Sequence, residues 1–250
     1  DKERGLYAMK AFFKRFREAQ RPFCTMVVAA AGSSQRMGGE NKLLLPLDGV
    51  PVLCRTLWAV DRAAGVDEII LAVREEDLLE ISGLCRNLGL SKPVKVVRGG
   101  EDREKSVYLA SLEADPRAEL LAVQDGDRPL VTPELIDAVI DRAAHTAAAA
   151  PAVPVKDTVK VAQDGIVTQT PDRSTLWAVQ TPQVFDAQLL KAALQSALEA
   201  DAPITDDCSA VERMGKQVYL VEGSYENIKI TTPVDLAIAE AILQSREEQE

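Results

Sequence analysis

Between residues 25 and 144, short apolar runs alternate with amphipathic segments of helical length. The pattern predicts strands at residues 26–30, 68–73, 94–97 and 120–124, and helices at 52–64, 77–88, 104–114 and 133–144. Strands joined by helices run parallel, and a parallel sheet needs cover on both faces. The sequence therefore predicts an α/β fold with a Rossmann-like, mostly parallel twisted sheet and helices on both faces.

The alternation stops at Lys156, where the segment KDTVKVAQDGIVTQTPDR has the pattern of a β-hairpin. Its turn is expected at Asp164–Gly165, between the apolar pairs Val159/Val161 and Ile166/Val167. An isolated two-stranded hairpin is marginal in water, so we expect this arm to pack on another surface, such as a second copy of the chain. Helices are expected again at 187–200, 207–214 and 234–244, and a strand at 217–221.

These segments suggest an N-terminal extension at 1–24, one domain at 25–245 with the protruding arm at about 156–180, and a tail at 246–250. The extension contains MKAFFKRFREAQRPF, in which phenylalanines lie among basic residues. It fits a basic amphipathic helix that docks on the domain or touches a membrane surface, and it equally fits a loose terminus.

Composition excludes several classes of protein. A net charge of −10 argues against a nucleic-acid-binding face, and no apolar run reaches membrane-spanning length. The four cysteines are scattered without metal-binding spacing, and His145 is the single histidine. Reduced cysteines and the lack of a secretory signal predict a cytoplasmic protein with no membrane partner.

A loop of small and basic residues, AAAGSSQRMGGENK at 29–42, follows the first apolar run. In a doubly wound sheet this position lies at the edge where ligands bind. Glycines let the backbone come close to a ligand, and Arg36 and Lys42 bring positive charge, a combination that suits a phosphate chain. The loop matches neither the dinucleotide fingerprint nor the P-loop, and by itself it also fits an ordinary exposed connection.

This loop resembles the A-A-G-x-G-x-R-M-x(n)-K signature of the sugar-phosphate nucleotidyltransferases. Six later segments narrow the resemblance to the 2-C-methyl-D-erythritol 4-phosphate cytidylyltransferase family over residues 25–243. In order, they are GGEDREKSV (99–107), VQDGDRPLV (123–131), VKDTVK (155–160), DRSTLWAVQTPQVF (172–185), ITDDCSAVE (204–212) and NIKITTPVDL (227–236).

The resemblance implies transfer of CMP from CTP to a polyol phosphate, with Mg²⁺ or another divalent cation as cofactor, in the non-mevalonate isoprenoid pathway. It also implies a homodimer in which the arm crosses to the partner subunit. Such chemistry depends on positioning and charge stabilisation more than on acid–base side chains.

The resemblance further implies a role for each matching residue. Catalytic cations would be Arg36, Lys42 and Lys229. Nucleotide-binding residues would be Ala30, Ala31, Gly32, Gly100, Glu101, Ser106, Asp125 and Gly126, with Asp125 also a metal ligand. Substrate-binding residues would be Arg128, Thr158, Arg173, Thr181, Thr205 and Lys229.

The sequence departs from the family pattern at several points. The gap between Arg36 and Lys42 is shorter than in familiar members, and Glu101 replaces a common aspartate. The usual D-A-A-R-P reads D-G-D-R-P here, which adds Asp127 beside a phosphate site. This carboxylate must point away or join the metal, and the sequence leaves both open. Asp206 and Asp207 are interpreted as first-turn acids of the following helix.

Three alternative functions remain at this stage. One is ribitol-5-phosphate cytidylyltransferase, and another is a molybdopterin nucleotidyltransferase, against which the GGEDREKSV and hairpin segments weigh. The third is a nucleotide-binding regulator without catalytic activity, in which Asp127 would have disrupted the metal site. Lys42 and Lys229 are both present, which argues against loss of activity.

Overall fold

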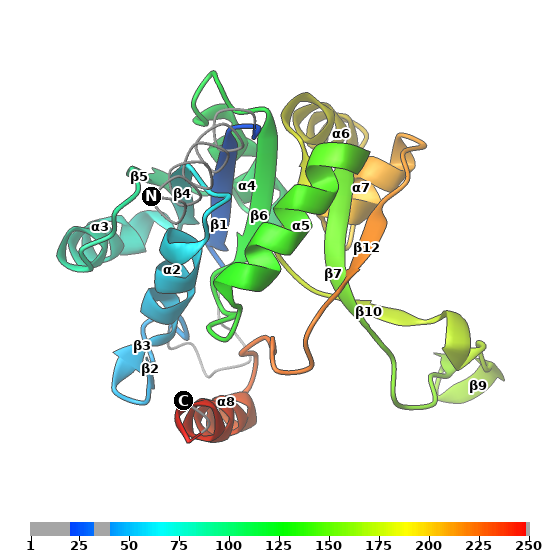
Figure 1. Ribbon diagram of the computed structural model, residues 1–250. Coiled ribbons are helices and arrows are strands. Elements are labelled where there is room, and N and C mark those ends of the chain that lie inside the picture. The colour runs from blue at the N-terminus through cyan, green and yellow to red at the C-terminus, as the bar shows by residue number, and fades with distance from the viewer. Residues whose placement is uncertain (1–20, 33–40, 249–250) are drawn as a thin grey trace, which may run out of the picture.

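An eight-stranded sheet forms the centre of the molecule, which is described here from a computed structural model covering residues 21–32 and 41–248 (Figure 1). The strand order is β10-β7-β11-β6-β1-β4-β5, and β12 also pairs with β7. The strands are β1 (Cys24–Ala30), β4 (Glu68–Val73), β5 (Val94–Arg98), β6 (Leu120–Asp125), β7 (Ala148–Pro154), β10 (Trp177–Val179), β11 (Gln183–Asp186) and β12 (Tyr219–Glu222). Among the described strands of this sheet, β10 and β11 are the two that run antiparallel to their neighbours, so the predicted mostly parallel sheet is confirmed.

Helices cover both faces of this sheet (Figure 1). On one face lie α2 (Val52–Arg62), α3 (Leu78–Asn87) and α5 (Pro133–Thr146). On the other lie α4 (Arg103–Leu112), α6 (Ala187–Glu199) and α7 (Asp207–Arg213). Successive residues of a strand point to opposite faces, and Met26 and Val28 accordingly join the first core while Val27 joins the second.

The two helices nearest the ligand edge begin with side-chain caps. The side chain of Thr132 accepts a hydrogen bond from the Leu135 N–H at 3.2 Å, and Pro133 occupies the first turn of α5, as the sequence predicts. Asp102 caps α4 by accepting from the Lys105 N–H at 2.7 Å. Both starts are therefore fixed by local sequence.

The strands β7, β10 and β11 are absent from the sequence-based prediction. β7 has the sequence AAAPAVP, whose alanines and prolines have low strand propensity. It is nonetheless buried at every position except Pro154, because β10 and β11 pair along one side and β12 along the other. Tertiary pairing therefore overrides local preference here.

The predicted arm is present and stands out from the sheet (Figure 1). It consists of β8 (Val161–Gln163) and β9 (Ile166–Gln169), joined through Asp164 and Gly165, which both have positive φ. Positive φ at both central residues is the geometry of a tight hairpin turn. The side chains of the arm are exposed in the single chain, and Ile166 is 70 % exposed.

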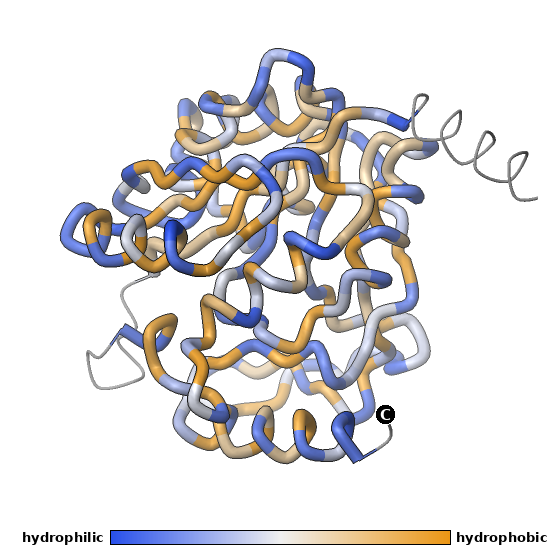
Figure 2. The backbone as a smooth tube through the Cα atoms, turned by 60° about the vertical axis from the view of Figure 1, so that its left-hand side comes forward, coloured by the Kyte–Doolittle hydropathy of each residue, from blue (hydrophilic) through white to orange (hydrophobic). Residues whose placement is uncertain are grey.

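A smaller layer lies below the ligand edge of the sheet. The helix α8 (Pro233–Glu247) packs with β2 (Pro46–Leu47) and the start of α2 in a separate hydrophobic cluster around Ile230, and β2 pairs with β3 (Val50–Pro51). Figure 2 shows hydrophobic and hydrophilic segments alternating along this helix, next to the C-terminus. The helix continues to Glu247, past the expected start of the tail at residue 246.

The N-terminal end of the described chain is attached to the domain. Arg21 donates to both carboxylate oxygens of Asp67, at 2.6 and 2.8 Å, and to the carbonyl oxygen of Gly65 at 3.0 Å. Of the N-terminal extension expected at 1–24, residues 1–20 lie outside the described residues, and Cys24 is the first residue of β1. No helix in the described part of the chain has the length and apolar character needed to cross a membrane.

Candidate active site

The site lies where β1 and β6 end side by side. Asp125 is the last residue of β6 and pairs in register with Ala29. The next residue, Gly126, donates its N–H to the Ala29 carbonyl oxygen at 3.0 Å, and a Cβ at Gly126 would lie 3.2 Å from that oxygen. Glycine therefore lets the turn after β6 close tightly over Ala30, at the start of the predicted phosphate loop.

Three cationic side chains converge on the carboxylate of Asp125. Lys229 Nζ lies 2.9 Å from Oδ2, Arg128 Nε lies 3.5 Å from Oδ2, and Arg103 Nη2 lies 3.3 Å from Oδ1. Burial favours the neutral acid, but the positive charges of Arg103, Lys229 and Arg128 outweigh it and hold the pKa of Asp125 well below its usual range. Asp125 is therefore an ionised carboxylate, and the sequence-predicted Asp125, Arg128 and Lys229 form one cluster.

Asp127 points into the same cluster. Its Oδ2 forms an ion pair with Lys42 Nζ, and its Oδ1 lies 3.9 Å from Lys229 Nζ. The residue is only 6 % exposed, and Oδ1 is a buried oxygen without a hydrogen-bond partner. Of the two orientations that the sequence leaves open, the one pointing away from the site is excluded.

Arg103 joins the cluster from α4 and was missed by the sequence reasoning. Its Nη2 contacts both Asp125 Oδ1 and Asp207 Oδ2, the latter at 2.8 Å. Burial opposes the charged guanidinium, but Asp207 and Asp125 raise its pKa above the usual value, so Arg103 is charged. Its position directly after the GGED loop is the sequence feature that could have identified Arg103 as a site residue.

Asp207 is more than a first-turn acid. Asp206, also expected in the first turn, is instead the N-cap of α7, and the side chain of Asp207 is fully buried against Arg103. Burial raises the pKa of Asp207, partly opposed by Arg103. The helix start alone predicts an exposed acid, and only the packing of α7 against α4 and α6 buries it.

The loop after β5 forms one wall of a pocket next to the first loop. Gly99 is packed so closely that a Cβ there would lie 2.7 Å from Ala31 Cβ. The pocket has a volume of about 610 Å³. Its lining residues are Ala31, Arg74, Glu75, Glu76, Arg98, Gly99, Gly100, Glu101, Lys105 and Leu109. Three predicted nucleotide-binding residues, Ala31, Gly100 and Glu101, therefore line one cavity.

Ser106, the third predicted residue of the GGEDREKSV segment, has a structural role in this conformation. Its hydroxyl accepts from the Gly100 N–H at 3.0 Å and donates to the Asp102 carbonyl oxygen at 2.6 Å. Glu101 is highly exposed, with its carboxylate 3.7 Å from Lys105 Nζ. Ser106 therefore fixes the loop from within, and Glu101 is accessible to a ligand.

An amide network around Asn227 and Gln180 contacts Arg128 and Thr181, and the sequence reasoning missed both amides. Asn227 donates to the Thr181 carbonyl oxygen at 3.0 Å, and its own carbonyl oxygen accepts from Arg128 at 2.7 Å. Thr181 accepts from the Asp125 N–H through its hydroxyl, at 3.1 Å. The Gln180 side chain bonds Ser224 and Asn227. Thr181, a predicted substrate-binding residue, thus contacts the backbone of Asp125.

Three predicted residues are not brought into the cluster within one chain. Thr158 and Arg173 are exposed on the arm, where Arg173 donates to the Lys156 carbonyl oxygen at 2.6 Å. Thr205 is exposed, and its N–H donates to Ser209 Oγ just before α7. Arg36 lies outside the described residues, and Gly32 is the last described residue before that gap.

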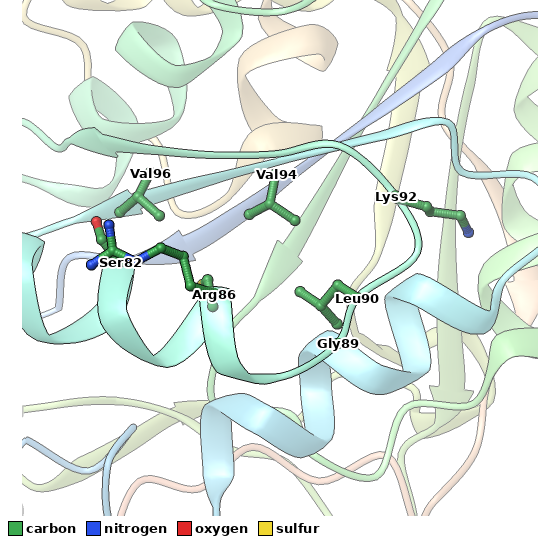
Figure 3. Close-up of a pocket in the computed structure, with 8 residues that line it drawn as sticks. Ser82, Arg86, Gly89, Leu90, Lys92, Val94 and Val96 are labelled. Atoms are coloured by element: carbon green, nitrogen blue, oxygen red, sulfur yellow. The ribbon is translucent and has the colours of Figure 1, made fainter.

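A second cavity lies elsewhere, between α3, the following loop and β5 (Figure 3). It measures about 420 Å³, and Arg86, Leu90 and Val94 are among its lining residues. Lys92 Nζ donates to the backbone carbonyl oxygens of Val60 and Ala63, so its ammonium group stabilises the C-terminal end of α2. None of the predicted site residues lines this cavity.

The donor set fits a divalent cation that is shared with a phosphate ligand. Among residues 21–32 and 41–248 no three histidine, cysteine or acidic side chains gather as a complete metal cage. Mg²⁺, however, is commonly held by one or two carboxylates together with substrate phosphates. Asp125 and the unpartnered Oδ1 of Asp127 provide such oxygens.

The fold and the cluster define a phosphate-handling enzyme of the nucleotidyltransferase class. Half-buried cations pair with buried carboxylates at the ligand edge of the sheet, and no acid–base triad is needed for phosphoryl transfer. A sequence profile described as 2-C-methyl-D-erythritol 4-phosphate cytidylyltransferase matches residues 24–245. The chain belongs to this family and is a nucleotidyltransferase.

Individual relatives agree with this assignment. The chain is 46 % identical over 220 residues to the 2-C-methyl-D-erythritol 4-phosphate cytidylyltransferase of Bacillus thuringiensis (strain Al Hakam), covering 88 % of this chain and 97 % of the relative. Identity to the enzyme of that name from Caldanaerobacter subterraneus subsp. tengcongensis is also 46 %, over 87 % and 97 % of the two chains.

Solved structures are similar over the same length. The 4-diphosphocytidyl-2C-methyl-D-erythritol synthase of Anaerococcus prevotii DSM 20548 has a TM-score of 0.80 and 34 % identity, covering 89 % of this chain and 96 % of that one. The 2-C-methyl-D-erythritol 4-phosphate cytidylyltransferase of Thermus thermophilus has a TM-score of 0.72 and 29 % identity, over 89 % and 99 %. The predicted family and enzyme class are confirmed.

Proposed function

We propose that this chain transfers CMP from CTP to 2-C-methyl-D-erythritol 4-phosphate, giving 4-diphosphocytidyl-2-C-methyl-D-erythritol and pyrophosphate. Family membership supports this substrate over ribitol 5-phosphate. The observation that carries the reaction is the convergence of Lys42, Arg128 and Lys229 on buried carboxylates beside the Gly100 pocket. A regulator without activity has no need for such a concentration of buried charge.

The cations act on the phosphates. A phosphate oxygen of the acceptor attacks the α-phosphorus of CTP, a new P–O bond forms, and the bond to the pyrophosphate leaving group breaks. Lys42 and Lys229 contact carboxylates in this conformation and can exchange them for phosphate oxygens. Preorganised cations stabilise negative charge that develops on those oxygens in the transition state. Arg36 would add a further charge from the loop.

The nucleotide base occupies the pocket beside Ala31, Gly100 and Glu101 in this proposal. Asp125 and Gly126 lie beneath the ribose and phosphates, and Asp125 would hold Mg²⁺ or another divalent cation. A bound divalent cation supplies charge neutralisation on the triphosphate oxygens. Arg128, Thr181, Thr205 and Lys229 bind the acceptor side.

The arm belongs to the same proposal. Residues 25–245 form the cytidylyltransferase domain, and its arm, at about 156–180, inserts into a second subunit. Thr158 and Arg173 then bind the acceptor phosphate in the partner's site. The exposure of both residues in the single chain supports this arrangement. We further propose that the enzyme acts in the cytoplasm.

A pyrophosphate-release assay tests the function. CTP with 2-C-methyl-D-erythritol 4-phosphate and Mg²⁺ should give rapid release, and ribitol 5-phosphate, GTP or ATP should give little. Lys42→Ala and Arg36→Ala should each lower the rate by roughly 10² or more, the scale for a lost preorganised charge. Lys191→Ala, an exchange on α6, is the matched control and should keep full activity. Turnover with GTP equal to that with CTP, or full activity in Lys42→Ala, would contradict the proposal.

A further inference from the structure

Asp127 is a buried charge that the proposed reaction does not use. It lies two residues after Asp125 and adds negative charge where a triphosphate is expected to bind. Burying an ionised carboxylate is costly unless its oxygens are paired. Only Oδ2 is well paired, with Lys42, whereas the nearest cation to Oδ1 is Lys229 at 3.9 Å. The position of this second oxygen therefore needs an explanation.

The ammonium group of Lys229 shows that a positive charge is stable between Asp125 and Asp127. Its ammonium lies 2.9 Å from Asp125 Oδ2 and 3.9 Å from Asp127 Oδ1, so the two carboxylates face the same positive charge. The backbone holds this arrangement, because the Ile230 N–H donates to the Asp127 carbonyl oxygen at 2.8 Å. A ligand with phosphate oxygens would draw Lys42 and Lys229 away. Asp127 would then lose its ion-pair partner, whereas Asp125 would lose Lys229 and keep Arg103 and Arg128.

Building on the proposed function, we propose that Asp127 is a second carboxylate ligand of the catalytic divalent cation. Asp125 and Asp127 together hold the metal, and the triphosphate completes its coordination. Two carboxylates with substrate phosphates are a usual set for Mg²⁺. In the nucleotide-free state, Lys42 and Lys229 occupy these carboxylates and act as exchangeable counter-ions.

Mn²⁺ binding provides a readout that is independent of turnover. Free Mn²⁺ is measured by electron paramagnetic resonance, with the metal alone and with a CTP analogue that carries a methylene group between the α- and β-phosphates. Asp127→Asn and Asp127→Ala should each weaken Mn²⁺ binding in the analogue complex by about tenfold or more, since even outer-shell changes cost that much. Asp141→Asn makes the same charge change on an exposed part of α5 and should leave the affinity unchanged.

A double-mutant cycle separates coordination from simple charge compensation. Lys42→Met removes the ion-pair partner of Asp127, and it should strengthen binding of Mn²⁺ alone several-fold. In Asp127→Asn the same Lys42→Met exchange should have little effect. Equal effects of Lys42→Met in both backgrounds would overturn the inference. Thermal unfolding of each variant checks that the chain is folded. Asp127→Ala introduces the alanine that the family pattern D-A-A-R-P has at position 127.

Anomalous diffraction from crystals grown with Mn²⁺ and the analogue gives the direct answer. The metal should lie about 2.1 Å from an oxygen of Asp125 and one of Asp127. A metal bound to Asp125 and phosphates, with Asp127 still paired to Lys42, would refute this ligand assignment while leaving the proposed function intact. If the wild-type chain neither binds the analogue nor turns over CTP, the function itself is wrong.

Discussion

At the scale of single residues, the site depends on charged side chains whose burial would cost free energy without an oppositely charged partner. Arg103 connects the loop after β5, the carboxylate of Asp125 and the start of α7 through one guanidinium. Removing one member of a buried ion pair leaves its partner uncompensated. Arg103 is therefore a positioning residue, which fixes the orientation of Asp125 without needing to touch the substrate.

Exchanging Arg103 for lysine should impair catalysis more than folding. Lysine keeps the charge but cannot bridge two carboxylates with a planar fork. We expect Arg103→Lys and Asp207→Asn each to lower kcat/KM for CTP by about 10- to 100-fold. The double variant should lose little more than either single variant, because both act on the same contact. Steady-state kinetics with the exposed Arg117→Lys as control measures this, and full additivity would argue against a shared role.

At the scale of elements, the arm and α8 differ in how their apolar residues are covered. Those of α8 pack against β2, Leu130 and Ile230 within the chain. The arm exposes Val161, Ile166 and Val167 on a two-stranded sheet that has no third strand in the described part of the chain. A two-stranded hairpin is marginal by itself, so a partner surface is the physical requirement for a stable arm.

Mixing two inactive variants tests the shared site. Arg173→Ala and Lys42→Ala should each be nearly inactive, since one changes the arm and the other the recipient site. After subunit exchange, part of the activity should return, because one of the two sites in a mixed dimer has both residues intact. Exchange is followed by labelling the two variants with different fluorophores. A mixture that exchanges and stays inactive, or a wild-type chain that sediments as a monomer, would contradict the shared site.

At the scale of the whole molecule, an acidic chain concentrates cations at one edge of its sheet. The net charge is −10, yet Lys42, Arg103, Arg128 and Lys229 lie around two adjacent carboxylates. Ion pairs at this depth are weakly screened by salt. Because the cations hold the pKa of Asp125 below its usual range, this carboxylate contributes to stability as well as to the site.

The pH dependence of unfolding should reveal that contribution. An acid whose folded-state pKa is lowered stabilises the fold above its unfolded pKa of about 3.9, and this stabilisation is lost as pH falls further. The wild-type advantage over Asp125→Asn in unfolding free energy should thus be constant from about pH 7 to 5 and shrink below about pH 4. Urea denaturation across this range measures it, with Asp141→Asn as control. An advantage that grows towards low pH would contradict the lowered pKa.

Local patterns were enough to predict the parallel half of the sheet, the arm and the strand-end position of Asp125. Continuous apolar runs of four or five residues, such as those of β4 and β6, are stable mainly as buried parallel strands, so these strands can be predicted from the sequence. The hairpin could also be predicted from the sequence, since Asp164 and Gly165 tolerate positive φ. The family signature supplied Lys42, Arg128 and Lys229 as site residues, and the structure brings all three together.

Tertiary structure alone decided the rest. The alanine- and proline-rich β7 is a strand because neighbours pair with it on both sides. Asp207 is buried because α7 packs across Arg103, and Asp127 points inward because Lys42 meets it from a distant part of the chain. Burial and charge pairing depend on atoms far apart in sequence, whereas propensity and periodicity report only on neighbours. The local sequence therefore determines the parallel strands β1, β4, β5 and β6, and the folded chain decides which charges meet at their ends.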